Sequence, residues 1–300
     1  MNMFAAAAAS ALLAIPPQAG PSTQRGANEQ IIVQGQNERA EIARFVDQLS
    51  VPQADIQLGK FLVPICPGVV GLPEAQNQLV ADRMRKVAET VGALVDTAGC
   101  APNAIVMVVR DKRAAIEDLW RRRSWLFGEI PSADMRLLEA LPGPAAGWQV
   151  VGKIQSEGMP LNSVRFGGVR DVAASQTVVS KSYTVVGRLQ QATVPQFLVS
   201  VVVIEDRALD GVTTTQLADY ASMRILAPIS WRERPLPAHS ILTLLTPGES
   251  KEVPLSVTWW DVALLKALYD TSNSVPADIQ RSAIAAAMQR EIRKVPPEER

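Results

Sequence analysis

Residues able to bind a cation or move a proton gather near position 205, where a strongly apolar run ends. Three acids, Glu205, Asp206 and Asp210, follow that run, and Gln216 and Asp219 come in the next segment. Carboxylate and amide oxygens are the ligands that Ca²⁺ prefers. The Asp-x-x-x-Asp-Gly spacing supplies only part of a calcium-binding loop, so we interpret the acids as turn and capping residues and predict no metal and no cofactor.

Nucleophilic chemistry has one possible pair, His239 beside Ser240, and His239 is the sole histidine of the chain. Neighbours in sequence seldom face each other, and no third orienting group can be named for a catalytic triad. The chain has no Gly-x-Ser-x-Gly elbow and no glycine loop of the phosphate-binding kind. A hydrolase that uses a pair of carboxylates needs only two acids, so it remains an alternative.

Two predicted elements position these residues. The run Phe197–Ile204 is β-branched and nearly unbroken, which is typical of a strand buried on both faces. Thr213 and Gln216 have capping-box spacing, so a helix is expected over Thr214–Leu226, with Gln216 and Asp219 near its polar edge. Its predicted inward face consists of Leu217, Tyr220, Ala221 and Ile225.

The best-specified unit precedes them and consists of a strand, a helix and a strand. Phe61–Val70 contains prolines and predicts an edge strand or a strand that ends at Cys66. Pro73 opens a helix to about Leu94, and Ala104–Val109 is a second strand. The helix is expected to bury Leu79, Val80, Met84, Val87, Val91 and Leu94.

Cys66 and Cys100 lie at the ends of the strand-helix connections, and they are the only cysteines. We predict a disulfide, which would close a loop of about 35 residues and stabilise the fold by roughly 3 to 4 kcal/mol. Two buried free thiols are the alternative. One histidine and two cysteines are too few for a zinc site.

Further elements are expected on either side of this unit. Trp120–Trp125 holds three arginines that could bind phosphate, although a solvated helix face with both tryptophans packed inward is the preferred interpretation. The remaining expectations are helices over Glu38–Leu49, Asp111–Leu126, from Ser132, from Thr258 to Tyr269 and over Ala277–Ile292, and strands at Trp148–Val151 and Thr177–Val186.

Composition and the N-terminus indicate the compartment. The charges of thirty basic and thirty acidic residues cancel, which disfavours a nucleic-acid partner. No stretch of 18 apolar residues follows the N-terminal segment, so we predict no integral membrane segment. Residues 1–19 resemble a signal peptide cleaved after Ala19, so a periplasmic or secreted protein is expected. The predicted domains are a flexible segment with a short helix (20–60), a globular α+β domain (61–295) and a tail (296–300).

A short extended island at Ile31–Gly35 resembles, over six residues, the TonB box at the mature N-terminus of bacterial outer-membrane receptors. An ordinary edge strand is the preferred interpretation. The resemblance implies a second alternative function, an accessory protein of an outer-membrane receptor.

The order of elements resembles the metzincin class of zinc peptidases. In that class a central helix bears His-Glu-x-x-His, a methionine turn often reads Ser-Ile-Met, and a later helix has a Thr-x-x-Asp start and a Leu-Tyr end. Here Ser240-Ile241-Leu242 corresponds to the turn, and Thr258–Asp261 with Leu268-Tyr269 to the later helix. The resemblance implies a zincin-like single mixed-sheet domain with a strand-helix-strand N-terminal unit and C-terminal helices.

The resemblance does not extend to the metal ligands. Gln216, Leu217, Asp219 and Tyr220 stand where His and Glu would be. We therefore expect a pseudoenzyme: an exported, non-catalytic binding or assembly module of the bacterial envelope, with an unknown protein or peptide partner. Its candidate groove comprises Gln216, Asp219, Tyr220 and His239.

Overall fold

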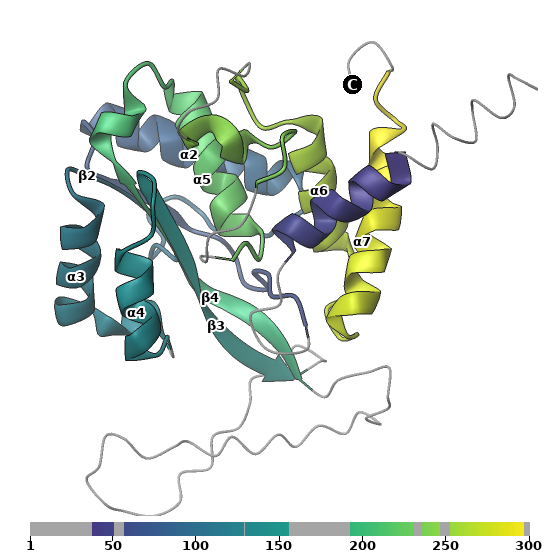
Figure 1. The fold of residues 1–300 in the computed structure, drawn as a ribbon, viewed down its shortest axis with the longest axis horizontal. Helices are drawn as coiled ribbons and strands as arrows, with labels where there is room; N and C mark the ends of the chain where they lie inside the picture. Colours follow the sequence, from purple (N-terminus) through teal and green to yellow (C-terminus); the bar gives the residue numbers. More distant parts are fainter. Residues whose placement is uncertain are drawn as a thin grey trace, which may run out of the picture. The chain divides into compact units, whose positions relative to one another are not determined.

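A four-stranded mixed sheet runs through the computed structural model, which describes residues 38–50, 57–128, 130–155, 193–230, 236–246 and 253–296 (Figure 1). The strands are β1 (Pro67–Val70), β2 (Ala104–Val109), β3 (Ala145–Gln155) and β4 (Thr193–Glu205). Their order is β1-β2-β4-β3, with β1, β2 and β4 parallel and β3 antiparallel to β4. The predicted signal peptide, the Ile31–Gly35 island and the strand at Thr177–Val186 lie outside the described residues.

The central strands alternate between two cores, because successive side chains of a strand point to opposite faces. Val202 and Ile204 of β4 belong to one core, and Val201 and Val203 belong to the other. All four side chains are fully buried, which confirms the prediction of a strand covered on both faces.

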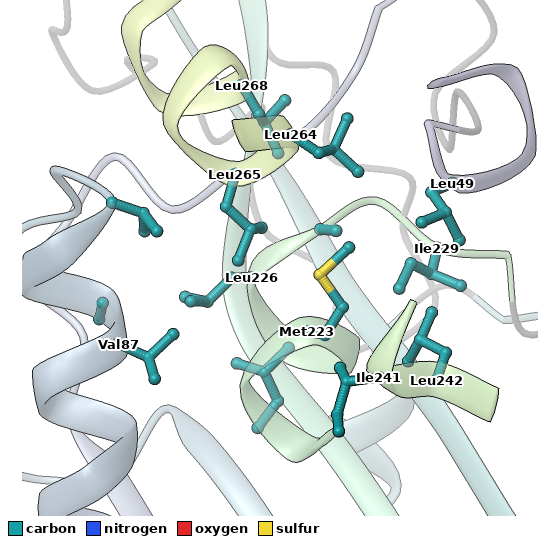
Figure 2. Close-up of a cluster of buried hydrophobic side chains, with 14 of the residues drawn as sticks. Leu49, Val87, Met223, Leu226, Ile229, Ile241, Leu242, Leu264, Leu265 and Leu268 are labelled. Carbon is teal, nitrogen blue, oxygen red and sulfur yellow. The ribbon is translucent and has the colours of Figure 1, made fainter. Parts of the chain in front are cut away.

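The larger core lies between the sheet and five helices. These are the helix over residues 38–49, α2 (Glu74–Thr90), α5 (Thr214–Leu226), α6 (Trp259–Asp270) and α7 (Ala277–Ile292). Figure 2 shows leucine, isoleucine, valine and methionine side chains from several of these helices converging around Met223 and Leu226 of α5. The helix over 38–49 adds Phe45 and Leu49 to this core.

The smaller core lies on the opposite face, under α3 (Lys112–Arg122), the 3-10 helix η1 (Ser124–Phe127) and α4 (Ser132–Glu139). Its centre is Trp148, whose indole N–H donates to the Leu126 carbonyl at 2.7 Å and whose ring stacks on Phe127. Figure 1 shows α3 and α4 on one side of β3 and β4, and α5 and α6 on the other. The described residues therefore form an α+β domain, as predicted.

The strand-helix-strand unit is present, and its disulfide joins Cys66 to Cys100 with their Cα atoms 6.0 Å apart. β1 is an edge strand, as predicted, but it begins only at Pro67, because Pro64 lacks the N–H that an earlier ladder with β2 would require. Two side chains predicted to be buried are exposed. Leu79 lies about 100° round α2 from the buried Val80 stripe, and Leu94 follows the end of that helix.

The helix expected over Asp111–Leu126 is shorter than predicted. Asp111 caps it, but α3 ends at Arg122, and the chain continues as η1. Trp120 packs edge-on against Phe127, whereas Trp125 is 58% exposed instead of packing inward. Within the described ranges, no helix is both long and apolar enough to cross a membrane.

Candidate functional site

Helix α5 carries three of the four candidate groove residues, and its start has the predicted capping box. The Thr213 hydroxyl accepts from the Gln216 backbone N–H at 3.1 Å, and the Gln216 side-chain oxygen accepts from the Thr213 N–H at 3.1 Å. The amide nitrogen of Gln216 then donates to the Pro254 carbonyl at 2.9 Å. Gln216 therefore starts the helix and also holds a later segment against it.

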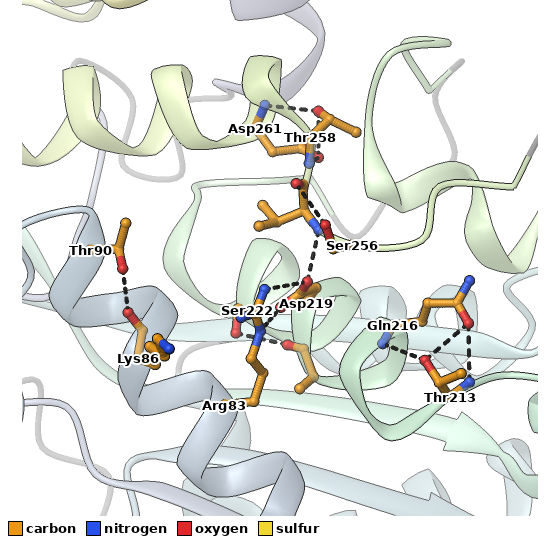
Figure 3. Close-up of polar contacts among 12 residues, drawn as sticks. Arg83, Lys86, Thr90, Thr213, Gln216, Asp219, Ser222, Ser256, Thr258 and Asp261 are labelled. Atoms are coloured by element: carbon orange, nitrogen blue, oxygen red, sulfur yellow. Dashed lines mark hydrogen bonds and ion pairs between the residues drawn. The ribbon is translucent and has the colours of Figure 1, made fainter. Parts of the chain in front are cut away.

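Asp219 lies one turn further along α5 and is fully buried. It accepts two hydrogen bonds from Arg83 of α2, from Nε at 2.7 Å and from Nη2 at 2.9 Å, and a third from the Val257 N–H at 2.8 Å (Figure 3). Its hydrogen bonds to Arg83 raise the pKa of the guanidinium. Asp219 thus joins α2, α5 and the segment before α6.

The predicted polar edge of α5 is therefore wrong for Gln216 and Asp219, which are 7% and 0% exposed. The physical reason is that α2 and residues 253–258 cover that side of the helix and bring their own donors to it. Tyr220 is buried as predicted, and its hydroxyl accepts from Arg224 Nε at 3.2 Å.

A second buried carboxylate, Asp261, holds the other end of the same segment. It forms the predicted capping box with Thr258 at the start of α6. It also accepts from the Ser240 hydroxyl at 2.6 Å and from the Ile241 N–H at 2.8 Å. Burial raises the pKa of the Asp261 carboxyl, although the hydrogen bonds from Ile241, Ser240 and Thr258 oppose the shift.

We call residues 253–258 the α5 strap, because they run between these two carboxylates. Gln216 and Asp219 fix the strap to α5 through Pro254 and Val257, and Asp261 fixes its end at Thr258. Figure 3 shows the chain of contacts from Arg83 through Asp219 to the start of α6.

His239, the fourth candidate groove residue, belongs to a different cluster. Its ring stacks on Trp260 with centroids 5.1 Å apart, and its Nε2 lies 3.0 Å from the Glu41 carboxylate. Only its backbone takes part in the strap region, where its carbonyl accepts from the Thr258 hydroxyl at 2.6 Å. The structure therefore brings Gln216, Asp219 and Tyr220 together on α5 and places the His239 side chain against the helix over 38–49.

The acidic turn after β4 also forms structural contacts. Glu205 accepts from the Lys112 N–H at 3.1 Å and from Arg207 at 2.6 Å, and so connects β4 to the start of α3. Burial alone would raise the pKa of Glu205, but hydrogen bonds from Lys112 and Arg207 and their positive charges lower it below its usual value. Among the described residues, no group of three or more His, Cys, Asp or Glu side chains is arranged to hold a metal ion.

Two important cations were not predicted from the sequence. Arg83 reaches Asp219 across 136 positions. Lys60 is 6% exposed, and its Nζ donates to the carbonyls of Leu268, Tyr269 and Thr271 at 3.0, 3.0 and 2.7 Å, at the C-terminal end of α6. Burial lowers the pKa of Lys60 to about 8. In the sequence, one local feature indicates that Lys60 is buried with a partner: it lies inside the apolar stretch before β1.

The chemistry available to the two buried carboxylates follows from these contacts. A general acid or base must exchange its proton with a substrate, which requires an accessible oxygen. Asp219 and Asp261 are both fully buried and hold backbone and side-chain donors of the protein itself. They act as cross-links between helices.

Comparisons with known proteins find no matching family model, no similar curated protein and no similar solved structure.

Proposed function

We propose that the protein is an exported, non-catalytic binding or assembly module of the bacterial envelope, built on a metalloprotease-like scaffold. The main support for this proposal comes from Gln216 and Asp219, which stand at positions that the metzincin resemblance assigns to the metal-binding motif. Both side chains are buried and engaged with Pro254, Arg83 and Val257. Because these side chains are engaged within the protein, α5 stabilises the core instead of presenting metal ligands to a cleft.

The order of elements supports a zincin-like scaffold. β4 leads through a short turn into α5, the Ser240–Leu242 turn follows, and α6 begins at the Thr258 capping box. Ile241 and Leu242 of that turn lie in the same core as Met223 of α5 (Figure 2). The turn therefore packs in the same core as the helix that the resemblance makes central.

The outer side of the α5 strap supports a binding role. Val253 and Leu255 are 50% and 83% exposed, and Trp259 at the start of α6 is 48% exposed. Exposed apolar side chains that lie close together along the chain are typical of surfaces that contact another protein. The disulfide fits an oxidising compartment outside the cytoplasm.

The two alternatives have less support. A hydrolase that uses carboxylates in the α5 groove would have to release Asp219 from Arg83 or Asp261 from the Ser240 turn. A receptor accessory protein would present Ile31–Gly35, which lies outside the described residues.

Metal content and peptidase activity test the proposal. Protein purified from the envelope fraction and dialysed should contain far less than one zinc per chain, because one histidine cannot supply three imidazole ligands. It should also leave an unfolded protein substrate intact, with and without added Zn²⁺. A zinc peptidase handled in parallel is the positive control. One zinc per chain, or proteolysis that a chelator abolishes, would refute the non-catalytic function, and an intact mass that retains Met1 would refute export.

A further inference from the structure

We propose that a groove between β1 and α2 binds an extended peptide segment of a partner protein, with an acidic side chain of that segment paired to Arg85. The inference rests on the proposed function only in treating the protein as a binder, and the groove is lined by no residue of the α5 strap.

The groove has a volume of about 210 Å³ and is lined by β1, by one side of α2 and by the disulfide with its neighbours Ala98 and Gly99. Pockets for complete small-molecule ligands usually measure about 300 to 1,000 Å³. A volume of this size suits one or two side chains of a longer ligand that lies mostly across the surface.

Opposite charges stand at the two ends of the groove. Glu74, Gln78, Ala81 and Arg85 line it from successive turns of α2. With a rise of 1.5 Å per residue, Glu74 and Arg85 are about 16 Å apart along the helix axis. Residues four positions apart in an extended chain are separated by about 13 Å, and their long side chains can span the remaining distance of about 3 Å, so a segment with an acid at one end and a base four positions later would match both charges.

Arg85 is a polar lining residue whose hydrogen bonding is incomplete among the described residues. Asn77 is paired with both backbone groups of Leu72, and Gln78 donates to Asp82 at 2.8 Å. Arg85 has one long contact, from Nη1 to Asp82 at 3.4 Å, and its buried Nε has no hydrogen-bond partner in the described part of the chain. A buried donor without a partner is unfavourable, and a carboxylate is the acceptor that best matches the planar guanidinium.

The free edge of β1 supplies the backbone groups for an extended ligand. Ile65 forms its backbone hydrogen bonds on the side of the strand away from β2: its N–H donates to the Leu94 carbonyl, and its carbonyl accepts from the Asp96 N–H. The Cys66 carbonyl faces the other way and accepts from the N–H of Ala104 in β2. Because successive residues of a strand alternate in direction, Val69 also points outward.

Among the described residues, β1 pairs with no strand other than β2. The chain that pairs with Ile65 as far as Asp96 continues through Gly99 to Cys100, which is bonded to Cys66, and no backbone hydrogen bond from residues 97–100 to β1 is found in the described part of the chain. Val69 can therefore exchange hydrogen bonds with an added strand, which is a common way for proteins to bind extended peptides.

The probe is a capped, fluorescein-labelled pentapeptide of sequence Glu-Val-Thr-Val-Lys, titrated against the full-length oxidised protein by fluorescence anisotropy at low salt. We expect saturable binding with a dissociation constant below 1 mM. Arg85→Gln should weaken it about tenfold, and Arg85→Lys should restore part of the loss, because a lysine keeps the charge without the planar fork. Val69→Pro removes the outward N–H and should weaken binding similarly while leaving the β2 ladder intact.

Arg136→Gln, on the exposed side of α4, is the matched control and should bind as the wild type does. Thermal unfolding of each variant checks that it is folded, and if Val69→Pro is not folded the two Arg85 variants decide alone. Absence of saturable binding, or equal affinity of wild type and Arg85→Gln, would overturn the inference. So would competition by inorganic phosphate at the peptide's own affinity, which would indicate a simple anion site. None of these outcomes affects the metal and peptidase test of the proposed function.

Discussion

The contact between Arg83 and Asp219 should be among the most stabilising side-chain contacts of the protein, and its two partners should differ in what their removal costs. The Asp219 side chain is 0% exposed, whereas Arg83 is 31% exposed. Arg83→Gln leaves a buried carboxylate whose remaining hydrogen bond, among the described residues, is the one from the Val257 N–H, and breaking a buried pair in this way costs about 3 to 5 kcal/mol. We expect a loss of about 3 kcal/mol for Arg83→Gln.

Asp219→Asn should cost less, about 2 kcal/mol. The amide keeps one oxygen for a donor, and the guanidinium that loses its partner can turn partly to water. The double variant should lose less than the sum of the two single changes, since no buried charge is left without a partner. Urea unfolding followed by circular dichroism measures all three losses in free energy of unfolding.

The pair Arg122 and Asp118 on α3 is the matched control, because its Nε to Oδ1 distance is also 2.7 Å but its side chains are 76% and 48% exposed. Arg122→Gln should change the free energy of unfolding by less than about 0.5 kcal/mol. Equal, small losses for Arg83→Gln and Arg122→Gln would refute the assignment of Asp219 as a buried cross-link.

Two further predictions concern the disulfide and Lys60. Replacing Cys66 and Cys100 together by serine should lower the free energy of unfolding by about 3 to 4 kcal/mol, and thiol titration of the denatured, unreduced wild type should find no free thiol; two free thiols would contradict the bridge. Because burial lowers the pKa of Lys60 from 10.5 to about 8, the unfolded chain holds more protons between these values, so stability should rise as the pH increases from 8 toward 10. Urea unfolding at several pH values measures this rise, which Lys60→Met should abolish; an equal rise in that variant would assign it to other groups.

Local patterns predicted the elements well, because their signals span only a few residues. The capping boxes at Thr213 and Thr258 each depend on a residue three positions later, and both formed as expected. The strand over Phe197–Ile204 was recognisable because an unbroken β-branched run can be buried on both faces.

The contacts that define the candidate site could not be predicted in this way. On a helix, Asp219 points away from the face formed by Leu217 and Ala221, and a polar residue there normally indicates solvent. Only the placement of α2, with Arg83 at the contact, turns that second face into an interior. The same holds for His239, because nothing near it in the sequence indicates that Glu41 and Trp260 will be its neighbours.

The distribution of fixed and free polar groups argues for binding at the edge of the sheet. Around α5, Gln216, Asp219 and Asp261 satisfy backbone groups of the strap and the Ser240 turn, so a ligand entering there would have to break contacts already made. At β1 a ligand would complete contacts instead, because Val69 has an outward edge and Arg85 forms a single long hydrogen bond among the described residues. Binding that satisfies a free donor avoids the loss that follows from displacing an existing hydrogen bond. For a partner bound through polar groups, the free edge of β1 beside the disulfide is therefore a more favourable site than α5, the helix that corresponds to the metal-binding helix in the family resemblance.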